Sequence, residues 1–71
     1  MKRFLFSLWY VGQDGHKRVE SHEESFECLA DAQVRARAIL SEAKRDRCGI
    51  QIDLYEKLPA NSGWRHAVSY Q

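Results

Sequence analysis

The sequence predicts an α+β domain of two layers, in which one helix packs on one face of a four-stranded antiparallel sheet. Two observations favour this ββαββ order. Residues 3–26 and 50–70 show the strand patterns and turn clusters of two hairpins, whereas the residues between them have a helical apolar period. A single helix can cover only one face of such a sheet.

The first hairpin is expected to pair strands at Arg3–Val11 and Lys17–Phe26. The sequence GQDG at residues 12–15 supplies residues that tolerate a positive φ, which a tight turn needs. The second strand is weak, because Val19 and Phe26 are its large apolar residues and have opposite parity. We expect a bulge or a short strand there, at a polar edge of the sheet.

The helix is expected to begin at Cys28 and to bury one stripe of apolar residues. The stripe spans an arc of about 100°. Its members are Leu29, Ala32, Ala36, Ile39, Leu40 and Ala43. Arg45 and Arg47 suit the negative end of the helix dipole, and Gly49 suits the left-handed position after the helix. Cys28 and Cys48 would then lie about 30 Å apart, which excludes an internal disulfide.

The second hairpin is expected after Gly49, where strict alternation returns. Ile50, Ile52 and Leu54 share one face, and Gln51, Asp53 and Tyr55 share the other. Pro59, Asn61, Ser62 and Gly63 form the connecting loop. In the last strand, Trp64, His66, Val68 and Tyr70 are expected on a common face.

The totals limit the class of protein. The chain has 71 residues, which make one domain, residues 1–71, without room for a second core. Eleven Lys and Arg against ten Asp and Glu leave a net charge of +1, which gives no large field to attract polyanions. Two unpaired thiols without a secretory pattern predict a cytoplasmic location. The longest apolar run is far too short to cross a membrane.

The order of apolar and glycine residues resembles that of small uncharacterised bacterial and phage proteins of about this length. The residues that carry the resemblance are Phe26, Leu29, Ala32, Ala36, Gly49, Gly63, Trp64, Ser69 and Tyr70. The resemblance implies the hairpin, helix, hairpin fold. It implies no particular activity.

Catalytic, cofactor and metal sites are not indicated by any spacing in the sequence. The potential ligands His16, His22, Cys28, Cys48 and His66 are scattered singly, whereas a zinc site needs closely spaced pairs. No serine lies in a nucleophile elbow. Glu23 and Glu24 are neighbours on a strand, so their carboxylates point to opposite faces. We therefore expect a protein that is not an enzyme and has no cofactor.

The best functional clue is the stretch FLFSLWYV at residues 4–11, because both of its faces are apolar. Phe4, Phe6, Leu8 and Tyr10 are assigned to the helix side, with Ile50, Ile52 and Leu54. The other face would expose four apolar side chains: Leu5, Trp9, Val11 and Tyr55. An exposed patch of several hundred Å² marks an interaction site. The predicted partner is a second copy of the chain or another protein, and the alternative is that the twisted sheet and long polar neighbours shield the patch.

Two other functions remain open. An acidic segment would imitate phosphates in a phage or mobile-element inhibitor of a host nucleic-acid-binding complex. Its residues are Glu20, Glu23, Glu24, Glu27 and Asp31. Alternatively, Trp9 and Tyr55 would stack unpaired bases while Arg37 and Lys44 bind phosphates. The low net charge counts against a long nucleic-acid footprint.

Overall fold

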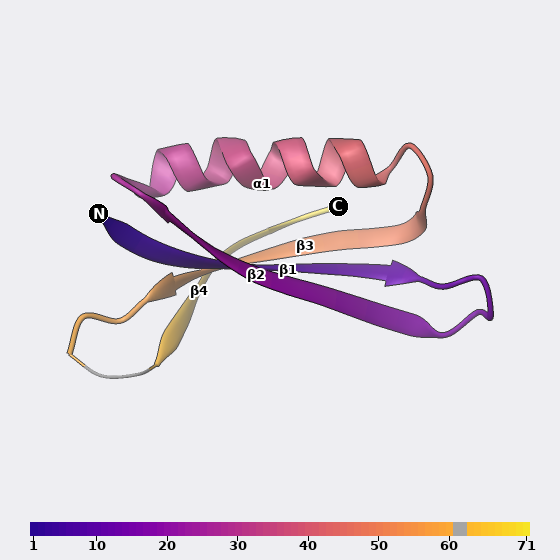
Figure 1. The fold of residues 1–71 in the computed structure, drawn as a ribbon, viewed down its shortest axis with the longest axis horizontal. Coiled ribbons are helices and arrows are strands. Elements are labelled where there is room, and N and C mark those ends of the chain that lie inside the picture. Colours follow the sequence, from indigo (N-terminus) through magenta and orange to yellow (C-terminus); the bar gives the residue numbers. More distant parts are fainter. Residues whose placement is uncertain (61–62) are drawn as a thin grey trace.

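The computed structural model describes residues 1–60 and 63–71, and within these ranges it has four strands and one helix. The elements are β1 (Lys2–Val11), β2 (Lys17–Phe26), α1 (Leu29–Ala43), β3 (Cys48–Lys57) and β4 (Trp64–Tyr70). All neighbouring strands are antiparallel, in the order β2-β1-β3-β4. The helix lies along one side of the sheet (Figure 1). The predicted two-layer ββαββ fold is therefore confirmed.

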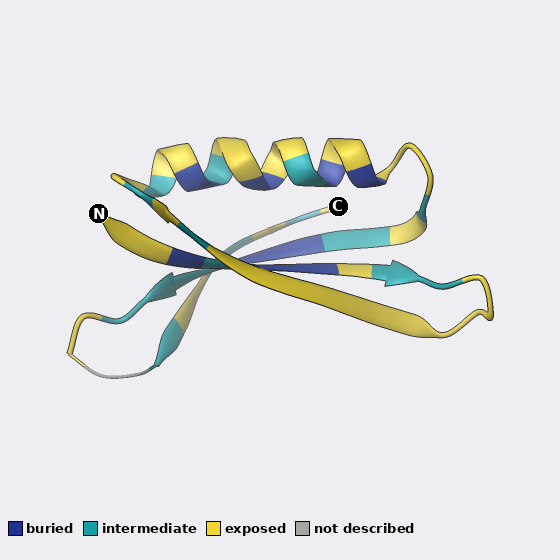
Figure 2. Ribbon diagram, in the orientation of Figure 1, coloured by how far each residue is buried: buried dark blue, intermediate teal, exposed yellow. Residues whose placement is uncertain are grey.

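The core lies between α1 and the two central strands. Phe4, Phe6, Ile52 and Leu54 are at most 1% exposed. Ala32 and Ala36 are fully buried on the facing side of α1, where their small size lets the helix backbone approach the sheet. Figure 2 shows the buried residues on the side of α1 that faces the sheet and along the middle of β1 and β3. The parity predicted for the helix side of β1 is thus confirmed.

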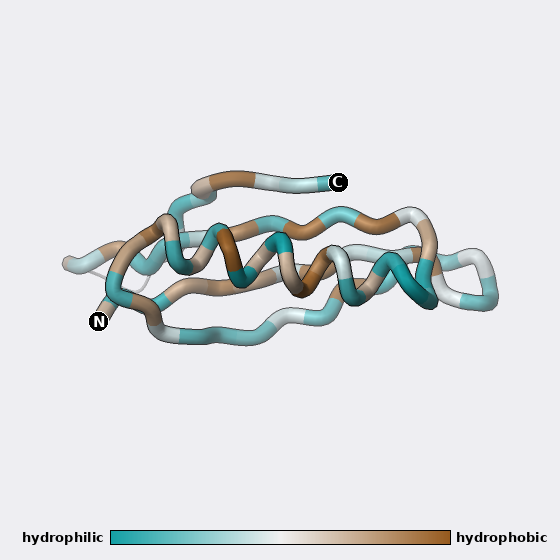
Figure 3. Tube along the Cα trace, turned by 90° about the horizontal axis from the view of Figure 1, so that it is seen from above, coloured by the Kyte–Doolittle hydropathy of each residue, from teal (hydrophilic) through white to brown (hydrophobic). Residues whose placement is uncertain are grey.

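The second strand is longer and more regular than its sequence suggests. β2 pairs with β1 over ten residues in unbroken register, from Lys2 opposite Phe26 to Val11 opposite Lys17. The expectation of a bulge or a short strand is wrong, because Val19 and Phe26 lie on opposite faces of a regular strand. Phe26 packs against the core cluster, whereas Val19 lies opposite Trp9 and therefore faces away from the helix. β2 is the largely hydrophilic strand at one edge of the sheet, opposite the β4 edge (Figure 3).

The helix ends earlier than predicted. α1 stops at Ala43, and short-range bonds tighten the chain beyond it, from the Arg45 N–H to the Glu42 carbonyl and from the Asp46 N–H to the Ala43 carbonyl. Arg45 and Arg47 therefore follow the helix instead of lying in its last turn. The Arg47 guanidinium instead binds the Glu20 carboxylate at 3.2 Å.

Gly49 has the predicted left-handed backbone, with φ of 65°, but for a different reason. It lies inside β3, where two residues of β3 oppose one of β1 between the pairs Trp9–Gln51 and Val11–Cys48. The glycine therefore forms a β-bulge and does not cap the helix. Cys48 starts β3 instead of lying at the helix end, and both cysteine thiols are free and exposed.

The last strand does not keep a single alternation. The register shifts between the pairs Leu54–Val68 and Tyr55–His66, so Ala67 is an extra residue in β4. Val68 and Tyr70 pack against the core cluster, whereas His66 lies beside Tyr55 on the other side of the sheet. The expectation that Trp64, His66, Val68 and Tyr70 share one face is therefore wrong.

Candidate functional site

The side of the sheet opposite α1 is left uncovered by every element that the structure describes (Figure 1). We call this side the open face. It is formed by alternate residues of the four strands. Its central residues are Leu5, Ser7, Trp9 and Val11 of β1, Val19, Ser21 and Glu23 of β2, Gln51, Asp53 and Tyr55 of β3, and His66 and Ser69 of β4.

A row of polar side chains crosses the middle of the open face. Ser21 lies opposite Ser7, Ser7 opposite Asp53, and Asp53 opposite Ser69. We call these four residues the polar row. Ser7 is 7% exposed and Asp53 is 9% exposed, so two polar side chains are buried on a face with no covering layer. Their neighbours therefore must satisfy their hydrogen bonds.

Asp53 is the centre of this arrangement. Its Oδ2 accepts a hydrogen bond from Trp9 Nε1 at 2.9 Å, and its Oδ1 accepts bonds from Gln51 Nε2 at 2.8 Å and Ser69 Oγ at 2.5 Å. Burial raises the pKa of the Asp53 carboxyl, but the bonds from Ser69, Gln51 and Trp9, with a smaller effect of His66, outweigh burial and leave the pKa below its ordinary value. Asp53 is thus a buried carboxylate that stays ionised at neutral pH.

The polar side chains around Asp53 are also paired with each other. Ser7 Oγ and Ser21 Oγ lie 3.0 Å apart, and Gln71 Nε2 donates to Gln51 Oε1 at 3.0 Å. Among the side chains of residues 1–60 and 63–71, no buried nitrogen or oxygen lacks a hydrogen-bond partner. The polar centre of the open face is therefore complete without any ligand.

A serine, a histidine and a carboxylate meet here, but in the wrong order for nucleophilic catalysis. His66 Nε2 lies 2.8 Å from Ser69 Oγ, and the Ser69 hydroxyl donates a hydrogen bond to Asp53 Oδ1. In a Ser-His-Asp triad the histidine lies between the acid and the serine and takes the serine proton. Because the Ser69 hydroxyl hydrogen points to Asp53 and not to His66, His66 is not placed to act as the base in this geometry.

The four predicted partner-binding residues all lie on the open face, but the polar row divides them. Leu5 lies directly opposite Tyr55 on one side of the row, and Tyr55 meets the His66 ring edge-on with centroids 5.5 Å apart. Trp9 and Val11 lie on the other side. The Trp9 side chain is 40% exposed although its indole N–H is bound to Asp53. The apolar surface is thus two clusters beside a shared polar centre.

Sequence reasoning missed Asp53 and Val19. Val19 is 46% exposed beside Trp9 and extends the apolar surface onto β2. Asp53 was assigned to the correct face, but nothing in its local pattern distinguishes it from a solvated carboxylate. The available signal was that Ser7, Ser21, Asp53 and Ser69 all occur at alternate, outward positions of predicted strands.

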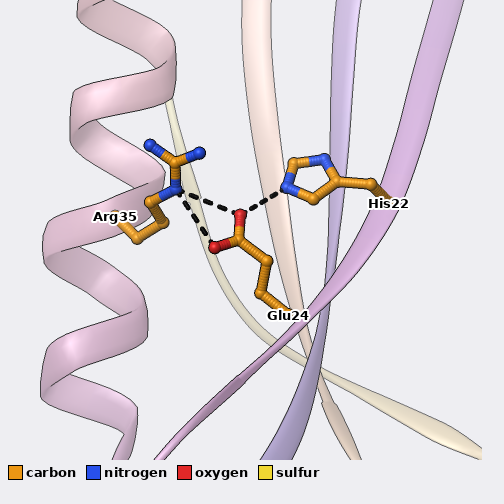
Figure 4. Close-up of polar contacts among 3 residues, drawn as sticks. All are labelled: His22, Glu24 and Arg35. Carbon is orange, nitrogen blue, oxygen red and sulfur yellow. Dashed lines mark hydrogen bonds and ion pairs between the residues drawn. The ribbon is translucent and has the colours of Figure 1, made fainter.

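The acidic residues do not gather on one surface. Glu20 and Glu24 lie on the helix side of β2, whereas Glu23 lies on the open face, where it pairs with Arg3. Glu24 binds Arg35 Nε at 3.0 Å and His22 Nε2 at 2.6 Å (Figure 4). Glu27 and Asp31 are exposed. Three of the five predicted phosphate mimics are therefore already paired with side chains of the same protein.

The hydrogen-bond partners of Glu20 and Glu24 lower the pKa of both carboxyls. Burial raises the pKa of Glu24, but hydrogen bonds from His22 and Arg35 outweigh it and the pKa lies below its ordinary value. The hydrogen bonds from Tyr10 and Arg47 lower the pKa of Glu20, and Glu20 in turn raises the pKa of Tyr10. Glu20 and Glu24 are therefore stabilised in their charged form by hydrogen bonds, which include the ion pairs that connect the edge strand to α1 and to the segment after it.

The Arg35–Glu24 pair joins α1 to an edge strand, and its removal is expected to have a small effect. Because both side chains are partly exposed, the change Arg35→Met is expected to lower the free energy of unfolding by about 0.5–1 kcal/mol at pH 7. Since the folded pKa of Glu24 is depressed, this difference should disappear as the pH falls below that pKa. Urea unfolding at pH 7 and pH 3 measures it.

The matched control for that change is Arg45→Met. Arg45 lies 3.5 Å from Glu42 with both side chains more than two-thirds exposed, so its removal is expected to have no measurable effect. A loss above about 2 kcal/mol for Arg35→Met, or a loss at pH 3 as large as the loss at pH 7, would show that this residue acts through packing instead of charge.

The predicted basic residues lie on the other layer of the protein. The Arg37 guanidinium is 5.6 Å from the centre of the Tyr70 ring, and Lys44 is the C-cap residue that follows α1. Trp9 and Tyr55 face the opposite side of the sheet. The four residues proposed to bind single-stranded nucleic acid therefore do not converge on one surface.

An open groove of about 540 Å³ runs between α1 and β2. Its lining includes the apolar Leu8 and Ile39 and the charged Glu20, Arg35 and Arg47. Within the described ranges, no three His, Cys, Asp or Glu side chains are grouped so that they could hold a metal ion. The groove thus offers a charged rim whose charges are already paired.

Comparison of the chain with family models, curated proteins and solved structures finds no match. The resemblance to small bacterial and phage proteins therefore stays a prediction. Of the helices in residues 1–60 and 63–71, none has the length and apolar character needed to cross a membrane. What the protein can do must follow from the geometry of its own surfaces.

Proposed function

We propose that this chain is a small, non-enzymatic protein-binding module whose contact surface is the open face. The observation that carries the proposal is the position of Trp9. Its indole is 40% exposed at the middle of an uncovered sheet, and a hydrogen bond to Asp53 holds it in place. Buried tryptophans are among the residues that contribute most to protein interfaces, and an anchor that is already ordered loses little entropy on binding.

The polar row supports the same function. Covering a polar group is unfavourable only if the group is left without a hydrogen bond. Asp53, Ser7 and Ser69 have their partners within the chain, so a binding protein can exclude water from the open face without supplying new donors. Leu5 and Tyr55 on one side, and Trp9 and Val19 on the other, then provide the apolar contact.

One observation favours a second candidate, the binding of unpaired bases. The Lys57 ammonium lies 5.2 Å from the centre of the Trp64 ring, so a cation and aromatic rings occur together beside Tyr55. Base stacking on such a surface depends strongly on salt. Against it, Glu23 neutralises Arg3 on this face, and the buried Asp53 carboxylate lies at its centre.

The experiment compares the wild-type protein with Leu5→Lys and Val34→Lys. Leu5 lies on the open face, whereas Val34 is 60% exposed on the outer side of α1 and provides a matched control with the same added charge. The three proteins are immobilised and exposed to the same cell lysate. We expect the amount of captured protein to be similar on wild type and Val34→Lys. On Leu5→Lys the same proteins should be reduced at least tenfold. Captured proteins that bind equally well to all three would contradict the proposal, provided that circular dichroism shows Leu5→Lys to be folded.

Tryptophan fluorescence separates the two candidates. Adding oligothymidylate at low salt is expected to leave the emission of Trp9 and Trp64 unchanged. Quenching at micromolar oligonucleotide that disappears in moderate salt would favour base stacking over protein binding.

A further inference from the structure

We infer that the protein that covers the open face is a second copy of this chain, forming a symmetric dimer of helix, sheet, sheet and helix. This inference rests on the proposed function, because both require the open face to be a contact surface. It goes further in naming the partner. Three features of the open face favour an identical copy: its area, its charge and the way its polar groups are paired.

The area of the open face matches the smallest specific interfaces. The molecule measures 40 × 22 × 15 Å, and the sheet extends along the longest and the shortest of these directions (Figures 1 and 3). These extents limit the face to a footprint of at most roughly 600 Å² per copy, and specific interfaces begin at about 1,200 Å² in total. A second sheet with the same right-handed twist stacks face to face at a small angle. An identical copy can therefore cover the whole face.

The charge of the open face suits a copy of itself. The chain has a net charge of +1, so two copies repel each other only weakly. On the face itself, Arg3 is paired with Glu23, and the Asp53 carboxylate is held by three donors. A face that must attract a strongly charged partner would carry an excess of one sign. With Arg3, Lys17 and Lys57 against Glu23 and Asp53, this face carries no large excess of one sign, so two identical surfaces repel each other only weakly.

The position of Asp53 selects one orientation of the two copies. If the two-fold axis crosses the strands along the polar row, each Asp53 faces Asp53 of the second copy, and two carboxylates oppose each other in a dry interface. If the axis runs parallel to the strands between β1 and β3, β1 lies over β3 of the second copy. Asp53 then faces Ser7, and Leu5 faces Tyr55 of the other chain. The geometry favours this second arrangement.

Light scattering and sedimentation from 1 µM to 1 mM test the dimer. An interface at the lower limit of size is expected to dissociate in the range of about 1–100 µM. Leu5→Lys is expected to weaken the dimer at least tenfold, and Val34→Lys to leave it unchanged. A wild-type protein that stays monomeric at 1 mM would overturn the dimer, yet it would leave the proposed function standing if Leu5→Lys still lost a different protein from the lysate. A dimer that Leu5→Lys does not weaken would overturn the open-face dimer, and together with lysate proteins that bind all three variants equally it would overturn both.

Cross-linking tests the orientation in a background of Cys28→Ser and Cys48→Ser. Chains with Leu5→Cys are mixed with chains that carry Tyr55→Cys, and a short bis-maleimide then links thiols that face each other across two sheets stacked about 10 Å apart. We expect more linked species in the mixture than from either chain alone, because Leu5 and Tyr55 of different copies face each other, whereas two copies of Leu5 are offset by one strand spacing. Linkage that is as efficient within each separate sample as in the mixture would overturn the axis parallel to the strands.

Discussion

Replacing Asp53 with alanine is expected to lower the free energy of unfolding by about 3 kcal/mol or more. The carboxylate is 9% exposed and accepts hydrogen bonds from Trp9, Gln51 and Ser69. Its removal leaves these three donors without an acceptor. A domain of this size has a total stability of only about 3–5 kcal/mol, so much of the variant should be unfolded at 25 °C. Urea unfolding followed by tryptophan fluorescence measures the loss.

Asp53→Asn separates the charge from the shape, and it stays informative if the alanine variant does not fold. One amide oxygen can still accept from Gln51 and Ser69, but the amide nitrogen then meets the Trp9 N–H, which is also a donor. We expect a loss of about 1.5–3 kcal/mol at pH 7. The control is Asp46→Asn, whose side chain is 79% exposed and whose change should stay within about 0.5 kcal/mol.

The pH dependence of this difference gives a sharper test. Because the folded pKa of Asp53 is depressed, its contribution is complete above the unfolded pKa of about 3.9 and is lost as the pH falls through the folded pKa. The gap between wild type and Asp53→Asn should therefore shrink steadily below pH 4. A gap that stays constant from pH 7 to pH 2 would mean that the carboxylate contributes through packing and not through its charge.

The parts of the fold that were predictable are those set by burial. The alternation of Phe4, Phe6 and Leu8, and the helical spacing of Ala32 and Ala36, each reflect a face that must leave water. Such periods are visible in one segment at a time. The layer structure, the order of the elements and the helix side of β1 follow from them directly.

The polar row was not predictable, because it depends on pairing between distant segments. Asp53 is 44 residues from Trp9 and 16 residues from Ser69 in the sequence. Strand order and register decide whether these side chains meet, and neither can be read from the local alternation of β3. The same reason explains the errors at Gly49 and in β4, since a bulge is defined by the partner strand.

The predicted end of the helix is wrong because Arg47 has a partner outside the helix. Arg45 and Arg47 looked like the basic residues of a last turn. In the folded chain the nearby Glu20 of β2 offers Arg47 a closer negative charge, and the Arg47 guanidinium also lies 4.4 Å from the centre of the Tyr10 ring. A direct ion pair together with a cation–π contact is worth more than a helix dipole on the surface. The partner of Arg47 lies on β2, which the local charge pattern around the helix end does not indicate.

Gly49→Ala is expected to lower the free energy of unfolding by about 2–5 kcal/mol. Gly49 has a φ of 65°, and a residue with a Cβ loses about 1–2 kcal/mol in this left-handed region. The new Cβ would also lie 2.6 Å from Val11 Cγ2, and such overpacking typically costs about 1–3 kcal/mol. Urea unfolding at pH 7 measures the sum. The change removes no polar contact, so any loss must come from the bulge itself.

Two further variants separate the two causes of this loss. Gly15 has a φ of 81° in the first hairpin turn. In the part of the chain that the structure describes, no atom lies within 4 Å of the Cβ that an alanine would add there. Gly15→Ala therefore measures the backbone effect by itself, which we expect to be about 1–2 kcal/mol. Adding Val11→Ala to Gly49→Ala removes the clash and should recover part of the stability. If Gly49→Ala is no worse than Gly15→Ala, the Val11 side chain moves aside freely. Because Val11 belongs to the open face, that freedom would also mean that this end of the face is too loosely packed to serve as a preformed contact surface.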